Sequence, residues 1–246
     1  MSMVLREELS EGIVAITLNR PESLNALSPA LFSELNQIVT ELSKQTDSVG
    51  CVILRGAGRC FSAGNDLKAV RSGVKAKEKF FQAKTIDLIE KLPQPTIASV
   101  HGHCLTGALE LALACDLMIT SESANLADTH GKWGMVPGWG MSVRLPRRVG
   151  LLKAKEMMFT GMSINGLQAV EIGLSSQCVA DDHLKVSTLD LAESIVKNSW
   201  HTNFADKKLF LDNENHFHDA SLNMEREQSA SVASDMHERV KQGFKS

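Results

Sequence analysis

The chain has 246 residues, of which 43% are hydrophobic and 22% charged, and its formal net charge is −3. This is the composition of a globular protein with a sizeable core, and its slight acidity argues against nucleic-acid and membrane-surface proteins, which are usually basic. The five cysteines show no CxxC spacing, and the N-terminus shows no signal-peptide pattern. We therefore expect buried free thiols and a cytoplasmic protein.

Strand and helix patterns alternate through the first 120 residues. The elements predicted from apolar periodicity and from turn residues are strands at 4–8, 13–18, 51–54, 96–100 and 117–120, and helices at 28–44, 77–91 and 108–114. A turn containing two glycines, at 102–107, precedes the last of these helices. Units of strand, turn, helix and strand at this length imply parallel crossovers and an α/β architecture.

The pattern changes near residue 184. Strand signals stop there, and segments 184–199, 204–212 and 220–241 all read as helices. These helices are polar over much of their length, so they need a partner surface to be stable. We predict a core at residues 1–183 and a helical C-terminal region at residues 184–246.

Two segments with small residues are candidates for binding an anionic oxygen. Residues 62–64, Ser-Ala-Gly, follow a predicted strand, and small side chains let the backbone approach a ligand closely. Gly107 begins a short helix, where unpaired N–H groups and the helix dipole favour negative charge. A carbonyl oxygen between the Ala63 and Gly107 amides would meet two donors, each worth roughly 3–4 kcal/mol of barrier.

Together these segments resemble the enoyl-CoA hydratase/isomerase (crotonase) family. The order and spacing match from about Val4 to Val179. The segments that carry the resemblance, with the family patterns they match, are residues 19–27 (NRPxxxNAL), 63–67 (AGxDL), 107–116 (GGxELAxxCD), 134–140 (GxxPGxG) and 159–161 with the stretch that follows them.

The resemblance implies a crotonase-like spiral of ββα units with a helical C-terminal trimerisation region, assembled as a homotrimer or a dimer of trimers. It implies an acyl-CoA substrate whose thioester oxygen lies between the Ala63 and Gly107 amides. No metal or redox cofactor is implied, since coenzyme A is part of the substrate. The residues implied to bind the substrate are Leu24, Ala26, Ala63, Asp66, Leu67 and Gly107. Simple packing is the alternative for the two leucines and Ala26, and a turn or cap role is the alternative for Asp66.

Glu110 is the main catalytic candidate. It lies three residues after Gly107. The resemblance implies that Glu110 corresponds to one of the two catalytic glutamates of the family's hydratases. A carboxylate there can activate water or exchange a proton with the substrate. The alternative is a helix N-terminal glutamate stabilised by the dipole.

The chain departs from the hydratase pattern at the second glutamate, where His130 stands. A histidine can exchange protons near neutral pH, and Asp128 is placed to orient it. The family's isomerases often carry an acid directly after the motif proline, but this chain has Gly138 there. Asp116, which ends the helix that carries Glu110, is interpreted as structural.

These residues lead us to predict an enzyme, an enoyl-CoA hydratase-like lyase with Ala63, Gly107, Glu110 and His130 as catalytic residues. The alternatives are other enolate chemistry, namely enoyl-CoA isomerase or acyl-CoA decarboxylase, and a non-catalytic acyl-CoA-binding protein. The basic run at residues 144–148 is interpreted as a solvated or subunit-contacting face, with contact to CoA phosphates as the alternative.

Overall fold

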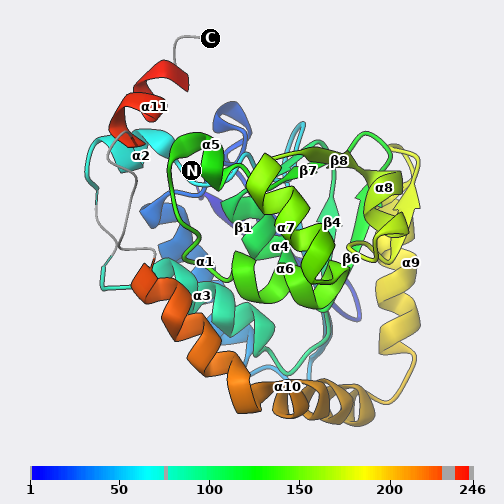
Figure 1. Ribbon diagram of the computed structural model, residues 1–246. Coiled ribbons are helices and arrows are strands. Elements are labelled where there is room, and N and C mark those ends of the chain that lie inside the picture. Colours follow the sequence, from blue (N-terminus) through cyan, green and yellow to red (C-terminus); the bar gives the residue numbers. More distant parts are fainter. Residues whose placement is uncertain (1, 75–76, 229–235, 244–246) are drawn as a thin grey trace.

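The protein is described by a computed structural model that covers residues 2–74, 77–228 and 236–243 (Figure 1). The strands in these ranges are β1 (Val4–Ser10), β2 (Gly12–Leu18), β3 (Val49–Gly56), β4 (Thr96–Val100), β5 (His103–Leu105), β6 (Leu117–Ser121), β7 (Asn125–Ala127), β8 (Ser163–Asn165) and β9 (Gln177–Val179). The α-helices are α1 (Pro29–Leu42), α2 (Leu67–Arg71), α3 (Phe81–Glu90), α4 (Gly107–Leu113), α5 (His130–Trp133), α6 (Met141–Val149), α7 (Leu151–Thr160), α8 (Gly166–Glu171), α9 (Leu184–Val196), α10 (Trp200–Gln228) and α11 (Met236–Gly243).

The main sheet has six strands in the order β1-β2-β3-β4-β6-β9. β1 pairs with β2 in the antiparallel sense, and the remaining neighbours are parallel. The predicted strands and their parallel crossovers are therefore confirmed. A second sheet, β5-β7-β8, was not predicted. Its three-residue strands are too short to show a period of two, and β5 lies inside the segment predicted as a turn.

The main sheet is covered on both faces. Along β2, Val14 and Ile16 pack in a large apolar cluster with residues of α1, α3 and α4, whereas Ile13 and Ala15 pack in a smaller cluster with α9. This alternation follows from the two-residue period of a strand. Because α9 forms the second covering layer, the boundary predicted at residue 184 falls inside the packed core.

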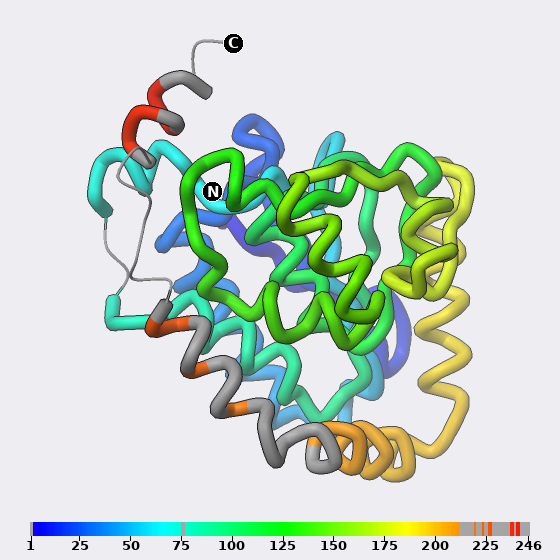
Figure 2. Tube along the Cα trace, viewed as in Figure 1, coloured from blue at the N-terminus to red at the C-terminus, as the bar shows by residue number. Residues whose placement is uncertain are grey.

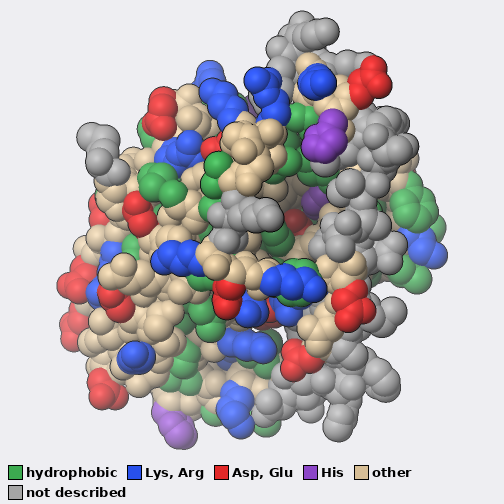
Figure 3. Space-filling view, turned by 90° about the vertical axis from the view of Figure 1, so that its left-hand side faces the viewer, with side chains coloured by type: hydrophobic (Ala, Val, Ile, Leu, Met, Phe, Trp, Pro, Cys, Tyr) green, Lys and Arg blue, Asp and Glu red, His purple; other side chains and the backbone are tan. Residues whose placement is uncertain are grey.

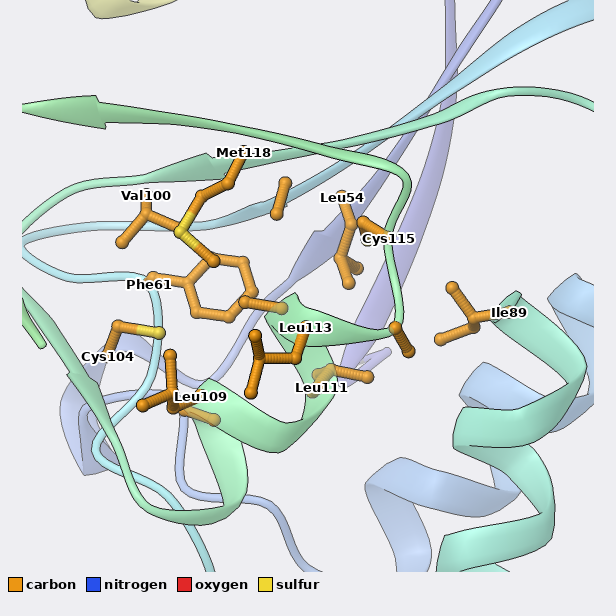
Figure 4. Packing of buried hydrophobic residues seen from close by; sticks show 14 of the residues in the cluster. Leu54, Phe61, Ile89, Val100, Cys104, Leu109, Leu111, Leu113, Cys115 and Met118 are labelled. Carbon is orange, nitrogen blue, oxygen red and sulfur yellow. The ribbon is translucent and has the colours of Figure 1, made fainter. Parts of the chain in front are cut away.

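Phe61 anchors the loop after β3 in the large cluster. Its fully buried ring lies among Val100, Met118 and Leu109 (Figure 4). Leu109 belongs to α4, so the same cluster fixes the loop around residue 63 and the start of α4 relative to each other. Both segments were predicted to supply donors to one oxygen.

The C-terminal helices run around the outside of the molecule (Figure 2). From α9 the chain crosses to α10, and α11 packs beside α2 and α5. Lys207 of α10 is buried and donates to Asp116 at 2.7 Å and to the Gln94 carbonyl at 3.0 Å. The helices predicted at 204–212 and 220–241 correspond to parts of α10 and α11, except for residues 229–235, which lie outside the described residues.

Trp200, at the start of α10, docks this helix on the sheet. Its indole lies over Gly12 and Gly50, and its Nε1 donates to the Val196 carbonyl at 2.9 Å. A Cβ added at Gly50 would lie 2.4 Å from Cε2 of the indole. Glycine is therefore required at positions 12 and 50, where the indole packs against the backbone.

We expect Gly50→Ala to lower the free energy of unfolding by about 1–3 kcal/mol, the usual cost of overpacking a buried site. The measurement is urea denaturation of the parent and the variant. The matched control is the same substitution in a Trp200→Leu background, where Gly50→Ala should cost much less. An equal cost in both backgrounds would show that the contact with the indole is not the cause.

The cysteines were predicted to be free and buried, and they are free. Four are buried, and Cys178 is partly exposed. Burial raises the pKa of Cys51 and of Cys115 to about 12 and raises the pKa of Cys104 well above its ordinary value. Thiols in this state stay protonated near neutral pH and are poor nucleophiles.

In the folded protein at pH 8 we expect iodoacetamide to alkylate Cys178 first. Cys51, Cys104 and Cys115 should react only after addition of denaturant, because the thiolate is the reacting form. Peptide mass spectrometry over a time course measures each site separately. Early labelling of Cys104 in the native protein would contradict the packing of β5 against the core.

Candidate active site

A cavity of about 630 Å³ opens between α2, α3, α4 and α5. A histidine and a carboxylate side chain are visible in a hollow among hydrophobic groups on this face of the molecule (Figure 3). Predicted residues that line the cavity are Ala63, Leu67, Gly107, Glu110 and His130, and the further lining residues include Asn65, Val70, Gln82, Thr106, Thr129, Lys132, Trp133, Met135, Val136 and Trp139.

Glu110 is held rigidly at the base of this cavity. It lies in the first turn of α4 and is 1% exposed. Its Oε1 accepts hydrogen bonds from the backbone N–H groups of Trp139 at 2.9 Å and Met141 at 3.1 Å. Hydrogen bonds to a carboxylate are stronger than neutral ones, so they fix this side chain and leave Oε2 directed toward the pocket. The backbone bonds join α4 to the segment before α6.

His130 stands opposite Glu110. Its Nδ1 lies 2.6 Å from Asp128 Oδ1, and its backbone N–H donates to the same oxygen at 3.1 Å. An ionised carboxylate only accepts, so a hydrogen bond between it and Nδ1 requires the proton on Nδ1. Nε2 then faces Oε2 of Glu110 at 3.8 Å. The orienting contact predicted for Asp128 is therefore present in the structure.

The geometry speaks against Ala63 as an oxyanion donor. Its N–H donates to the Leu24 carbonyl at 2.9 Å and is committed to that bond. Asn65, two residues on, forms a parallel bridge with Leu27, in which Leu27 N–H donates to Gly64 O and Asp66 N–H donates to Leu27 O. In such a bridge the middle residue points its own N–H away from the partner strand. Within the described residues the structure records no hydrogen bond from the Asn65 amide.

Gly107 supplies the other candidate donor. Its N–H is the first of α4, and no acceptor for it is recorded in the described part of the chain. A parallel bridge between Ser62 and Cys104 brings the Asn65 segment alongside the start of α4. A Cβ added at Gly107 would lie 2.5 Å from the Trp139 ring, so only glycine leaves room for this packing.

The remaining residues predicted to bind substrate divide into two groups. Leu67 lines the cavity, whereas Leu24, Ala26 and Asp66 are not among its described lining residues. Asp66 caps α2 through bonds from the Lys68 and Ala69 amides and pairs with Arg20 at 2.9 Å. Burial acts to raise the pKa of Asp66, but the hydrogen bonds from Arg20 and the α2 amides hold it below its ordinary value. The structure thus gives Asp66 the cap role that was the alternative.

The basic run at residues 144–148, predicted to be a solvated or subunit-contacting face, is mixed: Arg147 is exposed and Arg148 is partly exposed, but Arg144 is buried. Arg144 is 3% exposed and forms ion pairs with Asp87 at 2.9 Å and Glu90 at 2.8 Å. It also donates to the Trp139 carbonyl at 2.7 Å. Arg148 donates to the Asp116 carbonyl at 2.8 Å. Asp87, Glu90 and Asp116 are distant in sequence, so periodicity within the run does not reveal these contacts.

Asp116 has the structural role predicted for it. Its carboxylate accepts hydrogen bonds from the backbone N–H and the hydroxyl of Thr96, at 2.7 and 2.8 Å.

Across residues 2–74, 77–228 and 236–243, no cluster of metal-ligating side chains is found. No helix in those ranges is both long and apolar enough to cross a bilayer.

Comparison with known proteins identifies the family. Residues 8–246 match the family described as enoyl-CoA hydratase/isomerase. The chain belongs to the enoyl-CoA hydratase/isomerase family. A probable peroxisomal enoyl-CoA hydratase 1 of Arabidopsis thaliana is 36% identical over 189 residues, 77% of this chain and 71% of the plant protein. A putative enoyl-CoA hydratase/isomerase of Bacillus subtilis is 40% identical over 196 residues, 77% of this chain and 74% of that protein.

Solved structures of this family share the whole fold. An enoyl-CoA hydratase/isomerase from Xanthobacter autotrophicus Py2 superposes with a TM-score of 0.90 at 31% identity, over 99% of this chain and 93% of that one. An enoyl-CoA hydratase from Mycobacterium avium superposes with a TM-score of 0.81 at 32% identity, over 99% of this chain and 100% of that one. The predicted family and the predicted crotonase-like α/β fold are confirmed.

We expect Asp66→Asn to lower the free energy of unfolding at pH 7 by about 1 kcal/mol, through loss of the ion pair and of the charge at the start of α2. A depressed pKa contributes stability that is present above the ordinary aspartate pKa and is lost on acidification. The difference between parent and variant should therefore be full above about pH 5 and shrink below about pH 4. Urea denaturation across this range measures it.

The control is Asp182→Asn, a change at an exposed carboxylate, which should leave stability unaltered at every pH. Asp66→Asn should also leave the Kd for butyryl-CoA unchanged. A large rise in that Kd, with unchanged stability, would restore Asp66 to the substrate-binding set.

Proposed function

We propose that the protein is an enoyl-CoA hydratase, which adds water across the 2,3 double bond of a 2-enoyl-CoA thioester. Family membership supports an acyl-CoA substrate. The observation that carries the proposal is a pair of buried groups that line the cavity close to each other, Glu110 Oε2 and His130 Nε2, 3.8 Å apart. Hydration needs a base for water and an acid for carbon, and this pair offers both.

In the proposed reaction the thioester oxygen lies between the amides of Asn65 and Gly107. Glu110 takes a proton from water while the water oxygen bonds to C3. The electron pair of the double bond moves onto the thioester oxygen as an enolate, which the two N–H groups stabilise. The enolate then collapses, C2 takes a proton from His130 Nε2, and the 3-hydroxyacyl thioester forms.

Asp128 supports the acid role of His130. A carboxylate on Nδ1 fixes the ring orientation and stabilises the imidazolium form that donates from Nε2. After one turnover Glu110 holds the proton that His130 has lost. The short separation between the two groups provides a route for its return. His130 thus takes the place of the second glutamate of the family pattern without loss of an acid.

Other predictions from the sequence accompany this proposal. A homotrimer or a dimer of trimers is supported by large apolar side chains exposed on α7 and α8, among them Leu152 at 85% and Phe159 at 81%. The cytoplasmic location stays a prediction. The absence of a resident cofactor is also still a prediction, and it rests on the thioester itself supplying the activated C2. Activity that survives dialysis against a chelator would support it.

The test is hydration of trans-2-enoyl-CoA thioesters of short and medium length, followed by loss of the absorbance of the conjugated thioester. We expect the parent to hydrate at least one of them. Glu110→Gln keeps an acceptor for the Trp139 and Met141 amides but removes the base, so kcat should fall by about 10²–10⁴-fold. His130→Gln should cause a loss of similar order, and Asp128→Asn a smaller one.

A parent that binds butyryl-CoA but hydrates no enoyl-CoA would overturn the proposal. Turnover of a 3-enoyl-CoA or of a carboxyacyl-CoA would then identify the isomerase or decarboxylase alternative. Binding without any turnover would identify a non-catalytic acyl-CoA-binding protein.

A further inference from the structure

Thr106 has a backbone conformation that residues with a side chain rarely adopt. Its φ is 54° and its ψ is −109°, whereas Leu24 and Phe80, also at positive φ, lie in the ordinary left-handed helical region. A β-branched residue is strained at such angles, which glycine takes without cost. Thr106 directly precedes Gly107, the proposed oxyanion donor. Strain is therefore stored at the peptide that sets the direction of this N–H.

The strained turn is fixed by hydrogen bonds from a neighbouring segment. The Thr106 N–H donates to the Ala127 carbonyl at 2.8 Å. Its hydroxyl accepts from the Thr129 N–H at 3.0 Å and also forms a hydrogen bond with the Thr129 hydroxyl. Thr106 is only 9% exposed, so these bonds are shielded from competing water.

Thr129 stands between Asp128 and His130, the orienting carboxylate and the proposed acid. On the other side, the Thr106 carbonyl accepts from the Glu110 N–H at 3.0 Å. The two threonines thus join the turn that carries Gly107 and Glu110 to the turn that carries His130. Both threonines also line the cavity.

We propose that Thr106 and Thr129 are positioning residues. They keep the oxyanion donor, Gly107 N–H, and the proposed acid, His130, correctly placed relative to each other and to the acyl group. The hydroxyl pair transmits the position of one turn to the other, and the strain at Thr106 is the cost of placing a hydroxyl there. This inference rests on the proposed function for its kinetic test. It also has a test that requires no turnover.

The informative variant is Thr106→Gly, because it removes the hydroxyl and the strain together. A residue that only stabilised the fold would lose stability and leave the chemistry intact. A positioning residue gives the opposite pattern. We expect the Tm to stay level or rise, since glycine adopts these angles freely, and kcat to fall about tenfold or more, with KM changed by less than about threefold.

Matched variants separate the hydroxyl from the backbone. Thr106→Ser and Thr129→Ser keep the hydroxyl pair and should retain activity close to that of the parent. Thr129→Val removes one hydroxyl at similar volume and should lower kcat as Thr106→Gly does. The double variant Thr106→Gly/Thr129→Val should be no slower than the slower single variant, because the two residues act through one contact.

The second readout is the ¹³C chemical shift of bound butyryl-CoA labelled at the thioester carbonyl, a saturated ligand that cannot be hydrated. The parent should polarise this carbonyl and move its resonance downfield, and Thr106→Gly should reduce that movement at an unchanged Kd. This result in a parent without hydratase activity would uphold the inference while the proposed function fails. A Thr106→Gly variant with the kcat and the carbonyl shift of the parent would overturn the inference.

Discussion

The buried carboxylate of Glu110 is the group on which the arrangement of the site depends. A carboxylate that is 1% exposed must find donors within the protein, and it finds them in two backbone amides, at Trp139 and Met141. Those amides belong to a segment held from its other side by Arg144, whose charge is satisfied by Asp87 and Glu90 of α3. The helix that carries the proposed base, the wall of the cavity and α3 are thereby joined through polar contacts in which each of these buried charges has a partner.

This arrangement divides the work between the carboxylate's two oxygens. One is engaged by the backbone and sets geometry, and the other faces the cavity and His130. The proposed acid, His130, is arranged similarly: Nδ1 contacts Asp128, and Nε2 is directed toward Glu110. Rigid support of groups that line the cavity is what preorganised catalysis requires.

Much of this was predictable from the sequence, and the limits have physical causes. Motifs of contiguous residues identified the family, and the position of Glu110 three residues after Gly107 placed the proposed base on the first turn of α4. The partner of His130 was predictable because Asp128 is only two residues away. The error at Ala63 arose because the direction of an N–H depends on strand register, and the bridge between Leu27 and Asn65 joins segments that the motif does not relate. Arg144 was misread for the same reason, since its partners lie more than fifty residues away.

The close approach of Glu110 to His130 also bears on the enzyme between turnovers. In the proposed reaction, release of the hydroxyacyl product leaves the proton on the Glu110 carboxylate. This is the form that can dehydrate the product, and the proton must return to His130 before another enoyl thioester can react. In this mechanism the free enzyme has two isomers that differ in the place of one proton, and product and substrate bind different isomers. Kinetically this is an iso-mechanism: if the shift between the isomers is slow, added product captures one of them and inhibits even at saturating substrate. A separation of 3.8 Å inside a shielded cavity favours a fast shift, and with it an enzyme that runs in either direction as the concentrations of thioesters dictate.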